Sequence, residues 1–271
     1  MYKKEKSKNT ALITGASSGI GFEISKCLAV RGFDLVLTAR NSDKLKAAAK
    51  RLSTYGEGEI DVVAADLHNP LAPQIIYDYC SNKGYKINLL VNNAGYAIAS
   101  PFDQTSMEDE EKFIRVLGIA VIALSKLFIK DMLKSADGKI MMISSVAAFA
   151  PPSTIQTLYG PIKTFVNRFS EGLNINYNHR GITSTAVCPG YTVTNFHAAS
   201  GVQEEMDRVP SFMKKEASRV AKEAVEATLK GRKVCVPSKT FKLIVFLLRV
   251  LPHSLFPLFS KRLAPGRYDQ K

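Results

Sequence analysis

The sequence has no tryptophan and few residues of the types that build metal centres or disulfide frameworks. It contains four cysteines and four histidines, all dispersed, and no Cys-x-x-Cys pair. This pattern is typical of reduced, mostly buried thiols in a cytoplasmic protein. Neither a disulfide framework nor a metal site is expected.

Signals for export, membrane spanning and domain division are also missing. Residues 1–8 are charged and lack an apolar core, so they do not resemble a secretory signal. The apolar segment at 239–252 contains an uninterrupted apolar run of only six residues, which is too short to cross a bilayer. No linker rich in proline, glycine or serine divides the chain. We therefore expect one domain over residues 1–237, followed by a basic, apolar extension over 238–271.

Acidic residues are scarce where basic residues gather, near the C-terminus. The chain has 24 acidic and 37 basic residues, and residues 227–271 contain ten of the basic residues but one acid, Asp269. A helix over 239–252 would be amphipathic. It would contact an anionic membrane through residues 239–262, peripherally at the inner surface, or act as a lid or subunit contact. We expect a homodimer or homotetramer, and no nucleic-acid partner because no reading motif accompanies the charge.

What the sequence does contain is a regular alternation of strand-like and helical segments. Apolar runs typical of strands fall at residues 11–14, 34–39, 60–65, 87–91, 139–144, 183–188 and 233–236. Helical periodicity fills most gaps, at residues 20–31, 42–52, 70–82, 111–134, 156–179 and 217–230. The alternation predicts the α/β class, with a doubly wound, seven-stranded parallel sheet, helices on both faces and a C-terminal amphipathic helical extension. Ligands bind such sheets at the carboxyl ends of the strands.

A glycine-rich turn directly after the first strand gives the strongest functional signal. The segment reads Thr14-Gly15-Ala16-Ser17-Ser18-Gly19-Ile20-Gly21 and precedes a predicted helix. Glycines allow the backbone to turn tightly and to approach a pyrophosphate, whose charge is stabilised by the N–H groups at the helix start. In this context the pattern predicts nucleotide binding rather than a plain turn.

Residues after the next three strands refine this prediction. Arg40 stands at the exit of the second strand, where NAD(H)-binding folds carry an acid for the ribose 2′-hydroxyl. A guanidinium suits a 2′-phosphate instead, so NADP(H) is predicted over NAD(H). Asp66, followed by Leu67, either accepts a hydrogen bond from the adenine amino group or caps the next helix. Asn92-Asn93-Ala94-Gly95 either forms a simple turn or leaves room for a flat ligand.

Acid–base chemistry is indicated by Ser144-Ser145 and by Tyr159-Gly160-Pro161-Ile162-Lys163. Tyr159 and Lys163 are four residues apart and share a helix face. A neighbouring ammonium favours the tyrosinate, so it lowers the phenol pKa from about 10 towards the working pH. Such a tyrosine can donate a proton to a carbonyl oxygen as hydride arrives, or accept one from an alcohol. Pro161 should lie in the first helical turn, which places Tyr159 at the end next to the cleft.

In their order and spacing, these motifs resemble the short-chain dehydrogenase/reductase family over roughly residues 8–237. The resemblance rests on Thr-Gly-x-x-x-Gly-x-Gly at 14–21, Asn-Asn-Ala-Gly at 92–95, Ser-Ser at 144–145, Tyr-x-x-x-Lys at 159–163 and Pro-Gly at 189–190. It implies a single Rossmann-like domain that uses a nicotinamide cofactor. It also implies that Tyr159 is the acid/base, that Lys163 holds the ribose hydroxyls and lowers the tyrosine pKa, and that Ser145 binds the substrate oxygen. Further cofactor contacts implied in this way involve Asn93, Ala94, Gly95, Pro189, Gly190, Thr192 and Thr194.

Two features depart from the family pattern. The asparagine that usually holds a proton-relay water in the long helix is replaced by Leu117, or by Gly118 if the register slips. Ser145 lies 14 residues before Tyr159, one more than expected, which leaves Ser144 as the fallback assignment.

The sequence therefore predicts an NADP(H)-dependent oxidoreductase that interconverts a carbonyl and a secondary alcohol. Apolar residues near the predicted substrate loop favour a lipid, steroid or fatty-acyl substrate, although core packing explains them nearly as well. They are Phe196, Met206, Val209, Phe212 and Met213. The alternative is a regulatory or scaffold module that retains the nucleotide fold with weak or no catalysis, and Leu117 is its support in the sequence.

Overall fold

A parallel sheet of seven strands forms the centre of the molecule, in the order β3-β2-β1-β4-β5-β6-β9. The computed structural model describes residues 9–98, 100–151, 157–194, 207 and 209–250. The strands are β1 (Thr10–Thr14), β2 (Asp34–Ala39), β3 (Ile60–Ala64), β4 (Ile87–Asn92), β5 (Gly138–Ile143), β6 (Ile182–Val187) and β9 (Val234–Cys235). The predicted sheet is confirmed, and each strand end lies within one residue of its predicted position.

The strand order reverses in the middle of the sheet. β1 pairs with β2 on one side and with β4 on the other, all in parallel. The chain therefore runs outward to β3, returns to the centre and runs outward again to β9. In doubly wound sheets the crevice at such a reversal binds the ligand, and here it lies at the ends of β1 and β4.

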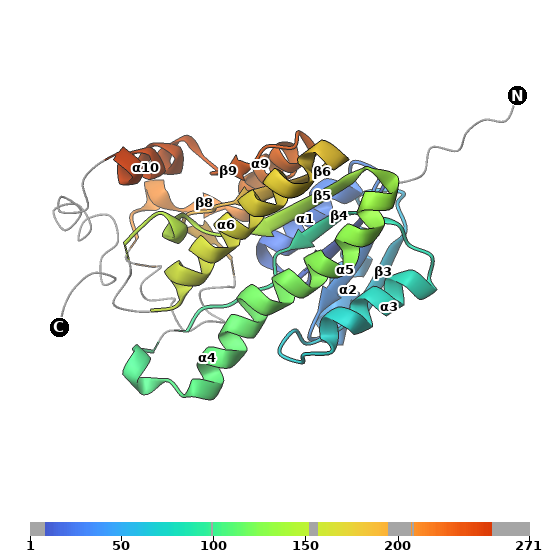
Figure 1. Cartoon of the computed structure of the whole chain (residues 1–271), viewed down its shortest axis with the longest axis horizontal. Coiled ribbons are helices and arrows are strands. Elements are labelled where there is room, and N and C mark those ends of the chain that lie inside the picture. Colours follow the sequence, from blue (N-terminus) through green and yellow to red (C-terminus); the bar gives the residue numbers. More distant parts are fainter. Residues whose placement is uncertain (1–8, 99, 152–156, 195–206, 208, 251–271) are drawn as a thin grey trace, which may run out of the picture.

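Helices cover both faces of the sheet, as predicted (Figure 1). One face carries α1 (Gly19–Ala29), α2 (Ser42–Leu52) and α9 (Ala217–Leu229), and the other carries α3 (Ala72–Asn82), α5 (Ala120–Ser135) and α6 (Tyr159–Tyr177). Successive strand residues point to opposite faces, so Ile13 packs on the first face and Leu12 on the second.

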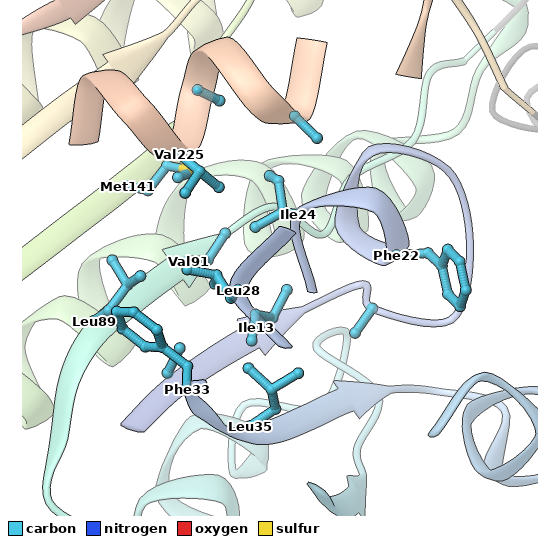
Figure 2. Close-up of a cluster of buried hydrophobic side chains, with 14 of the residues drawn as sticks. Ile13, Phe22, Ile24, Leu28, Phe33, Leu35, Leu89, Val91, Met141 and Val225 are labelled. Carbon is cyan, nitrogen blue, oxygen red and sulfur yellow. The ribbon is translucent and has the colours of Figure 1, made fainter. Parts of the chain in front are cut away.

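The first face illustrates what holds the layers together. Ile24 and Leu28 of α1 are fully buried, and they lie between Ile13 of the sheet and Val225 of α9 (Figure 2). Burying each such side chain stabilises the fold by about 1.5–3 kcal/mol. This packing fixes the start of α1 relative to the end of β1.

The long helix predicted at residues 111–134 is divided in the structure. α4 (Met107–Ile114) begins four residues earlier, at a capping box formed by Ser106 and Asp109. A π-helical turn (Arg115–Ile119) then leads into α5. Such a turn inserts an extra residue into the helical repeat, and it falls on Leu117.

The remaining differences from the prediction are small. α3 begins at Ala72 rather than at residue 70, because the Asn69 side chain accepts a hydrogen bond from the Leu71 N–H and holds a turn there. Two short strands, β7 (Thr192–Val193) and β8 (Lys215–Glu216), form a separate parallel pair. Single 3₁₀ turns occur at Phe102–Gln104, Val146–Ala148, Asn178–Arg180 and Ser211–Met213.

The described part of the C-terminal extension is a helix, α10 (Lys239–Val250). Its Phe241 and Val245 are buried against Ala186 and Cys188 at the end of β6. Residues 251–271 lie outside the described part of the chain. Among the residues that the structure describes, no helix is long and apolar enough to cross a membrane.

Candidate active site

The glycine turn between β1 and α1 has the form of a phosphate cradle. Gly15 and Gly19 adopt φ angles of +65° and +58°, which L side chains rarely adopt. α1 begins at Gly19, and its N-cap Ser18 makes no side-chain hydrogen bond to the helix. The N–H groups of the first turn are therefore not capped by this side chain and can bind an anion.

Asn93 holds this turn against the end of β4. Its Nδ2 donates to the carbonyl oxygens of Thr14 and Gly15, at 2.8 and 3.2 Å. In return, Thr14 Oγ1 accepts hydrogen bonds from the N–H groups of Asn93 and Ala94, both at 2.9 Å. A Cβ atom at Gly21 would overlap Asn93 Nδ2 and the Gly15 carbonyl oxygen. This close approach requires glycine at position 21.

Arg40, Asp66 and Tyr96 follow the ends of β2, β3 and β4. Burial raises the pKa of the Tyr96 hydroxyl to about 12, and the nearby Arg40 guanidinium partly offsets this. His68 bridges Asp66 and Tyr96. Its Nδ1 lies 3.0 Å from Asp66 Oδ1, and its Nε2 lies 3.3 Å from Tyr96 Oη. Asp66 does not cap α3, whose N-cap is Leu71. The Asp66 carboxylate instead accepts a hydrogen bond from the backbone N–H of His68 in a local turn.

Leu67 and Gly95 offer little side-chain chemistry at this end of the sheet. The Leu67 side chain is buried in the core of the second face, which leaves its backbone as the group available to a ligand. Gly95 lies against Leu117: a Cβ atom at Gly95 would be 3.7 Å from Leu117 Cγ.

The two serines after β5 have different hydrogen bonds. Ser144 is buried, and its hydroxyl donates to the Lys163 carbonyl oxygen at 3.0 Å, which ties β5 to α6. Ser145 Oγ accepts from the Ala147 N–H at 3.1 Å. Ser145 thus retains a hydroxyl hydrogen to donate, whereas that of Ser144 is used within the fold.

Tyr159 is the first residue of α6 and Pro161 the third, in agreement with the prediction from the proline. Lys163 lies one turn further, with its Nζ 5.5 Å from the Tyr159 ring centroid. The lysine is buried, and its Nζ donates to the Ile143 carbonyl oxygen at 2.8 Å. Burial lowers the pKa of Lys163 to about 8. A cation in such a setting favours a neighbouring tyrosinate.

The loop after β6 reaches back to the glycine turn. A Cβ atom at Gly19 would lie 3.4 Å from the Thr194 side chain, so these two residues are neighbours. Thr192 Oγ1 donates to the Gly190 carbonyl oxygen at 3.0 Å. The Phe241 ring of α10 lies directly on Gly190, where a Cβ atom would overlap it. Pro189 is buried beside this contact.

Leu117 and Gly118 make apolar contacts within the π-helical turn. Leu117 is buried against Gly95, and a Cβ atom at Gly118 would lie 2.9 Å from Ile162 Cδ1. Neither position supplies a polar side chain for a proton relay. All the predicted site residues lie within the described chain, where they follow the carboxyl ends of β1 to β6 or begin α1 and α6.

A profile of the family described as short chain dehydrogenase matches residues 9–205. The chain is a short-chain dehydrogenase. It thus belongs to a family of oxidoreductases that use NAD(P).

Named relatives of this dehydrogenase are about one third identical to it over the aligned residues. It is 33% identical over 196 residues to "very-long-chain 3-oxoacyl-CoA reductase" from Anas platyrhynchos, covering 70% of this chain and 62% of that protein. It is 31% identical over 211 residues to "oxidoreductase UcpA" from Salmonella typhimurium, covering 78% and 80%. A solved short-chain dehydrogenase from Sphingobium yanoikuyae in complex with NADPH is 30% identical, with a TM-score of 0.79 and coverage of 91% and 97%. The chain therefore spans less than two thirds of the Anas platyrhynchos reductase.

Two neighbouring hollows lie at this end of the dehydrogenase, and Tyr159 lines the first of them. The first is lined by Ile98, Ser100, Phe102, Glu110, Phe113, Thr157, Leu158 and Tyr159. The second, of about 230 Å³, shares Ile98 and Ser100 with the first and extends to Tyr96 and Asp109. Within the described residues, no three His, Cys, Asp or Glu side chains form a group that could hold a metal ion.

Apart from Tyr159, sequence reasoning missed these lining residues as site residues, together with His68 and Phe241. Glu110 is buried in the first hollow and accepts a hydrogen bond from the Thr105 hydroxyl at 2.6 Å. It comes from α4, far in sequence from the catalytic motif, and no spacing rule connects the two. The position of Tyr96, directly after the Asn-Asn-Ala-Gly turn, was the one available signal, because residues after a strand end lie at the ligand edge.

Proposed function

We propose that this short-chain dehydrogenase interconverts a carbonyl and a secondary alcohol with NADP(H), and that Tyr159 transfers the proton. One observation carries the proposal: Tyr159 begins α6 one turn from a buried lysine and lines a largely apolar hollow. A phenol in that position can exchange a proton with a substrate oxygen held in the hollow.

The residues of the glycine turn fit a dinucleotide. Gly15 and Gly21 allow the turn to pack closely against Asn93, and Gly19 has no side chain beside Thr194, so a pyrophosphate can approach the N–H groups of α1. Thr194 would stand beside the pyrophosphate, with Asn93 supporting the turn from β4. Ser17, Ser18 and Ile20 would contribute through the same turn, and Pro189, Gly190 and Thr192 would line the nicotinamide side. When bound, the nicotinamide supplies or accepts the hydride.

The choice of NADP(H) is supported at the exit of β2. Arg40 is exposed there, and no acid follows the strand. Its guanidinium suits a 2′-phosphate through charge and geometry. The Sphingobium yanoikuyae relative is described in complex with NADPH.

The proton step follows from the polar groups around Tyr159. In reduction, Ser145 donates a hydrogen bond to the carbonyl oxygen and Tyr159 donates the proton to it. Lys163 stabilises the tyrosinate that remains, and in the oxidising direction Tyr159 takes the proton back. Leu117 offers no relay, so Tyr159 regains its proton from solvent.

An apolar substrate is supported by Ile98, Phe102, Phe113 and Leu158 in the first hollow. The hollow itself is small, about 10 Å³, so these side chains would contact the apolar part of a lipid, steroid or fatty-acyl compound without enclosing it. One relative is named for a 3-oxoacyl-CoA substrate. Of the residues in the predicted substrate loop, Phe196 and Met206 lie outside the described residues. Val209 and Met213 are buried in the cluster under α10, which accounts for them by packing.

The proposal also includes self-association and membrane contact. Exposed apolar side chains on α5 and α6, such as Ile122, Phe165 and Ile175, support a homodimer or homotetramer. Peripheral contact with an anionic membrane is proposed through residues 239–262. Of these, the structure describes residues 239–250, which form α10.

Replacing Tyr159 by Phe tests the catalytic proposal. The natural protein should oxidise NADPH at a measurable rate with at least one of a panel of apolar ketones. In the variant, turnover should fall by about 10²–10⁴, the usual contribution of a positioned acid or base. The Kd for NADPH should hardly change, because the ring remains.

Two results would contradict the proposal in different ways. Turnover retained in the variant would exclude Tyr159 as the acid/base. Tight NADPH binding by the natural protein without turnover of any carbonyl would instead favour a binding module that retains the fold.

A further inference from the structure

The helix α10 is apolar on two opposite sides. Phe241, Ile244 and Val245 pack into the cluster at the end of β6. A second stripe, here called the outer stripe, consists of Leu243, Phe246, Leu247 and Val250, which are 59%, 59%, 40% and 57% exposed. Their spacing of three, four and seven residues places them along one side of a helix, opposite the packed side.

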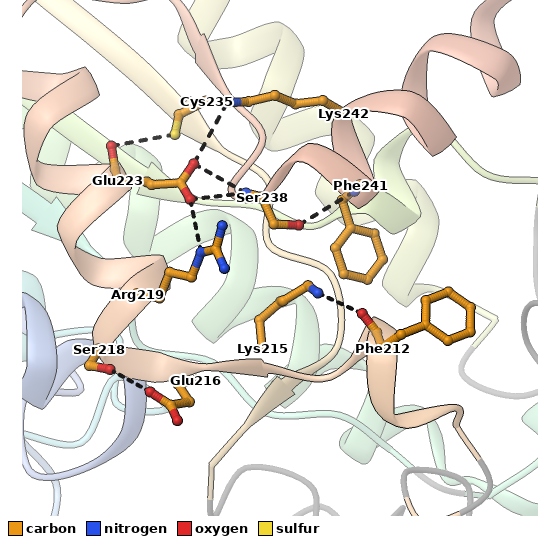
Figure 3. Close-up of polar contacts among 10 residues, drawn as sticks. All are labelled: Phe212, Lys215, Glu216, Ser218, Arg219, Glu223, Cys235, Ser238, Phe241 and Lys242. Carbon is orange, nitrogen blue, oxygen red and sulfur yellow. Dashed lines mark hydrogen bonds and ion pairs between the residues drawn. The ribbon is translucent and has the colours of Figure 1, made fainter.

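The packed side fixes the orientation of the outer stripe. The carboxylate of Glu223 on α9 accepts from the Ser238 N–H at 3.1 and 3.2 Å and lies 3.6 Å from Lys242 Nζ (Figure 3). At the other end of the helix, the Arg249 guanidinium lies 4.7 Å from the centroid of the Phe149 ring. Contacts near both ends of α10 thus hold this helix to the body of the protein. The helix lies at the periphery of the molecule (Figure 1).

The charges that α10 itself contributes beside the outer stripe are all positive, while Glu223 of α9 pairs with Lys242 from the packed side. Lys239, Lys242 and Arg249 are exposed, and α10 contains no acid. The sequence after α10 continues with apolar and basic residues, and Asp269 is its single acid. Pairing with a second copy would bring these positive charges together. An anionic lipid surface accommodates both the apolar side chains and the charge.

We propose that the outer stripe of α10 docks the protein on the surface of an anionic phospholipid bilayer. Leu243, Phe246, Leu247 and Val250 enter the interface between headgroups and acyl chains, while the basic residues beside them bind lipid phosphates. The opposite side of the helix contacts Gly190, so α10 lies between the bilayer and the loop that follows β6. This docking does not depend on catalysis.

Sedimentation of the full chain with vesicles tests the docking. The vesicles contain phosphatidylcholine alone or with about 30% phosphatidylserine, an anionic lipid. The variant carries Leu243→Ser, Phe246→Ser, Leu247→Ser and Val250→Ser, all at exposed positions. The control carries Leu71→Ser and Ile75→Ser, which remove exposed apolar side chains elsewhere. Thermal unfolding and NADPH binding establish that both proteins are folded.

We expect the natural chain and the control to bind the anionic vesicles. The affinity of the outer-stripe variant should fall about a hundredfold or more, because several apolar side chains no longer leave water. Binding of the natural chain should weaken in about 0.5 M salt, where charges are screened within a few ångströms.

Three results would overturn the proposal. The natural chain could fail to bind anionic vesicles at low salt, or the outer-stripe variant could bind as well as the control. The substitutions could also convert a dimer into a monomer while vesicle binding is absent, in which case a second copy covers the stripe. None of these results would alter the catalytic test with Tyr159→Phe.

Discussion

At the scale of single residues, Lys163 shows the conflict between stability and function in this site. Its ammonium is buried and, among the residues that the structure describes, donates to the Ile143 carbonyl oxygen. Burying a cation in this way costs folding free energy. The same burial brings the charge next to Tyr159 in a setting where it acts strongly on the phenol.

Replacing Lys163 by Met should therefore stabilise the protein at neutral pH while activity is lost. The free energy of unfolding should rise by about 1–3 kcal/mol, a figure from which the lost hydrogen bond to Ile143 has been subtracted. The folded pKa is about 8, against an ordinary value of 10.5. Between these values the unfolded state binds more protons, so the stability of the natural protein rises with pH across this window.

Denaturant unfolding of both proteins as a function of pH measures this effect. The advantage of the methionine variant should be greatest below pH 8 and should shrink as the pH approaches 10.5. Equal stability at neutral pH would mean that the ammonium carries no burial cost.

Arg40 is the residue that decides the cofactor in this account. Arg40→Asp should weaken NADPH binding by about 1.5–3 kcal/mol, because a charge-assisted contact is lost and a like charge is added. NADH binding should hold or improve. Lys50→Asp, on the exposed side of α2, makes the same change in net charge away from the strand end and should leave both affinities nearly unchanged. If the natural protein already prefers NADH, the interpretation of Arg40 is wrong.

At the scale of elements, the sequence predicted the strands, the turn after β1 and the start of α6, because each depends on a short stretch of residues. Apolar runs located the strands of the sheet, and the glycines of residues 15–21 located the turn after β1. Pro161 located the start of α6. Each of these depends on backbone preferences or on burial of nearby residues, which a short stretch of sequence contains.

The π-helical turn and the contacts between distant segments could not be found in this way. The turn keeps helical hydrogen bonding on both sides, so the periodicity around Leu117 shows no break. The placement of Phe241 on Gly190 joins residues 51 positions apart and depends on how α10 packs over β6. The bridge from His68 to Tyr96 likewise joins the loops after β3 and β4, two strands that β2 and β1 separate in the sheet.

Restoring a polar residue in the π-helical turn tests whether proton return limits the enzyme. Leu117→Asn should raise turnover, with little change in apparent substrate affinity, if reprotonation of Tyr159 is slow. Because Leu117 is buried, the change should cost about 1–3 kcal/mol of stability. Steady-state kinetics of the folded variant measure the effect, and unchanged turnover would show that the relay is dispensable.

At the scale of the whole molecule, the sheet gathers the separate parts at one edge. The cradle comes from the end of β1, Arg40 from β2, the serines from β5 and Pro189–Gly190 from β6, while α6 presents Tyr159 and Lys163. α9 and α10 pack beside the end of β6: Glu223 of α9 binds the Ser238 N–H, and Phe241 of α10 lies on Gly190. The arrangement brings the proposed dinucleotide cradle and the proposed acid–base pair to the same edge of the fold.

The most direct measurement follows the hydride itself. The natural protein is incubated with NADPH deuterated at both C4 positions and with an apolar ketone, and the alcohol is analysed by mass spectrometry. The account predicts one deuterium on the carbinol carbon, and label arriving about 10²–10⁴ times more slowly with Tyr159→Phe. NADPH bound by the folded protein, with no labelled alcohol from any carbonyl tested, would contradict it.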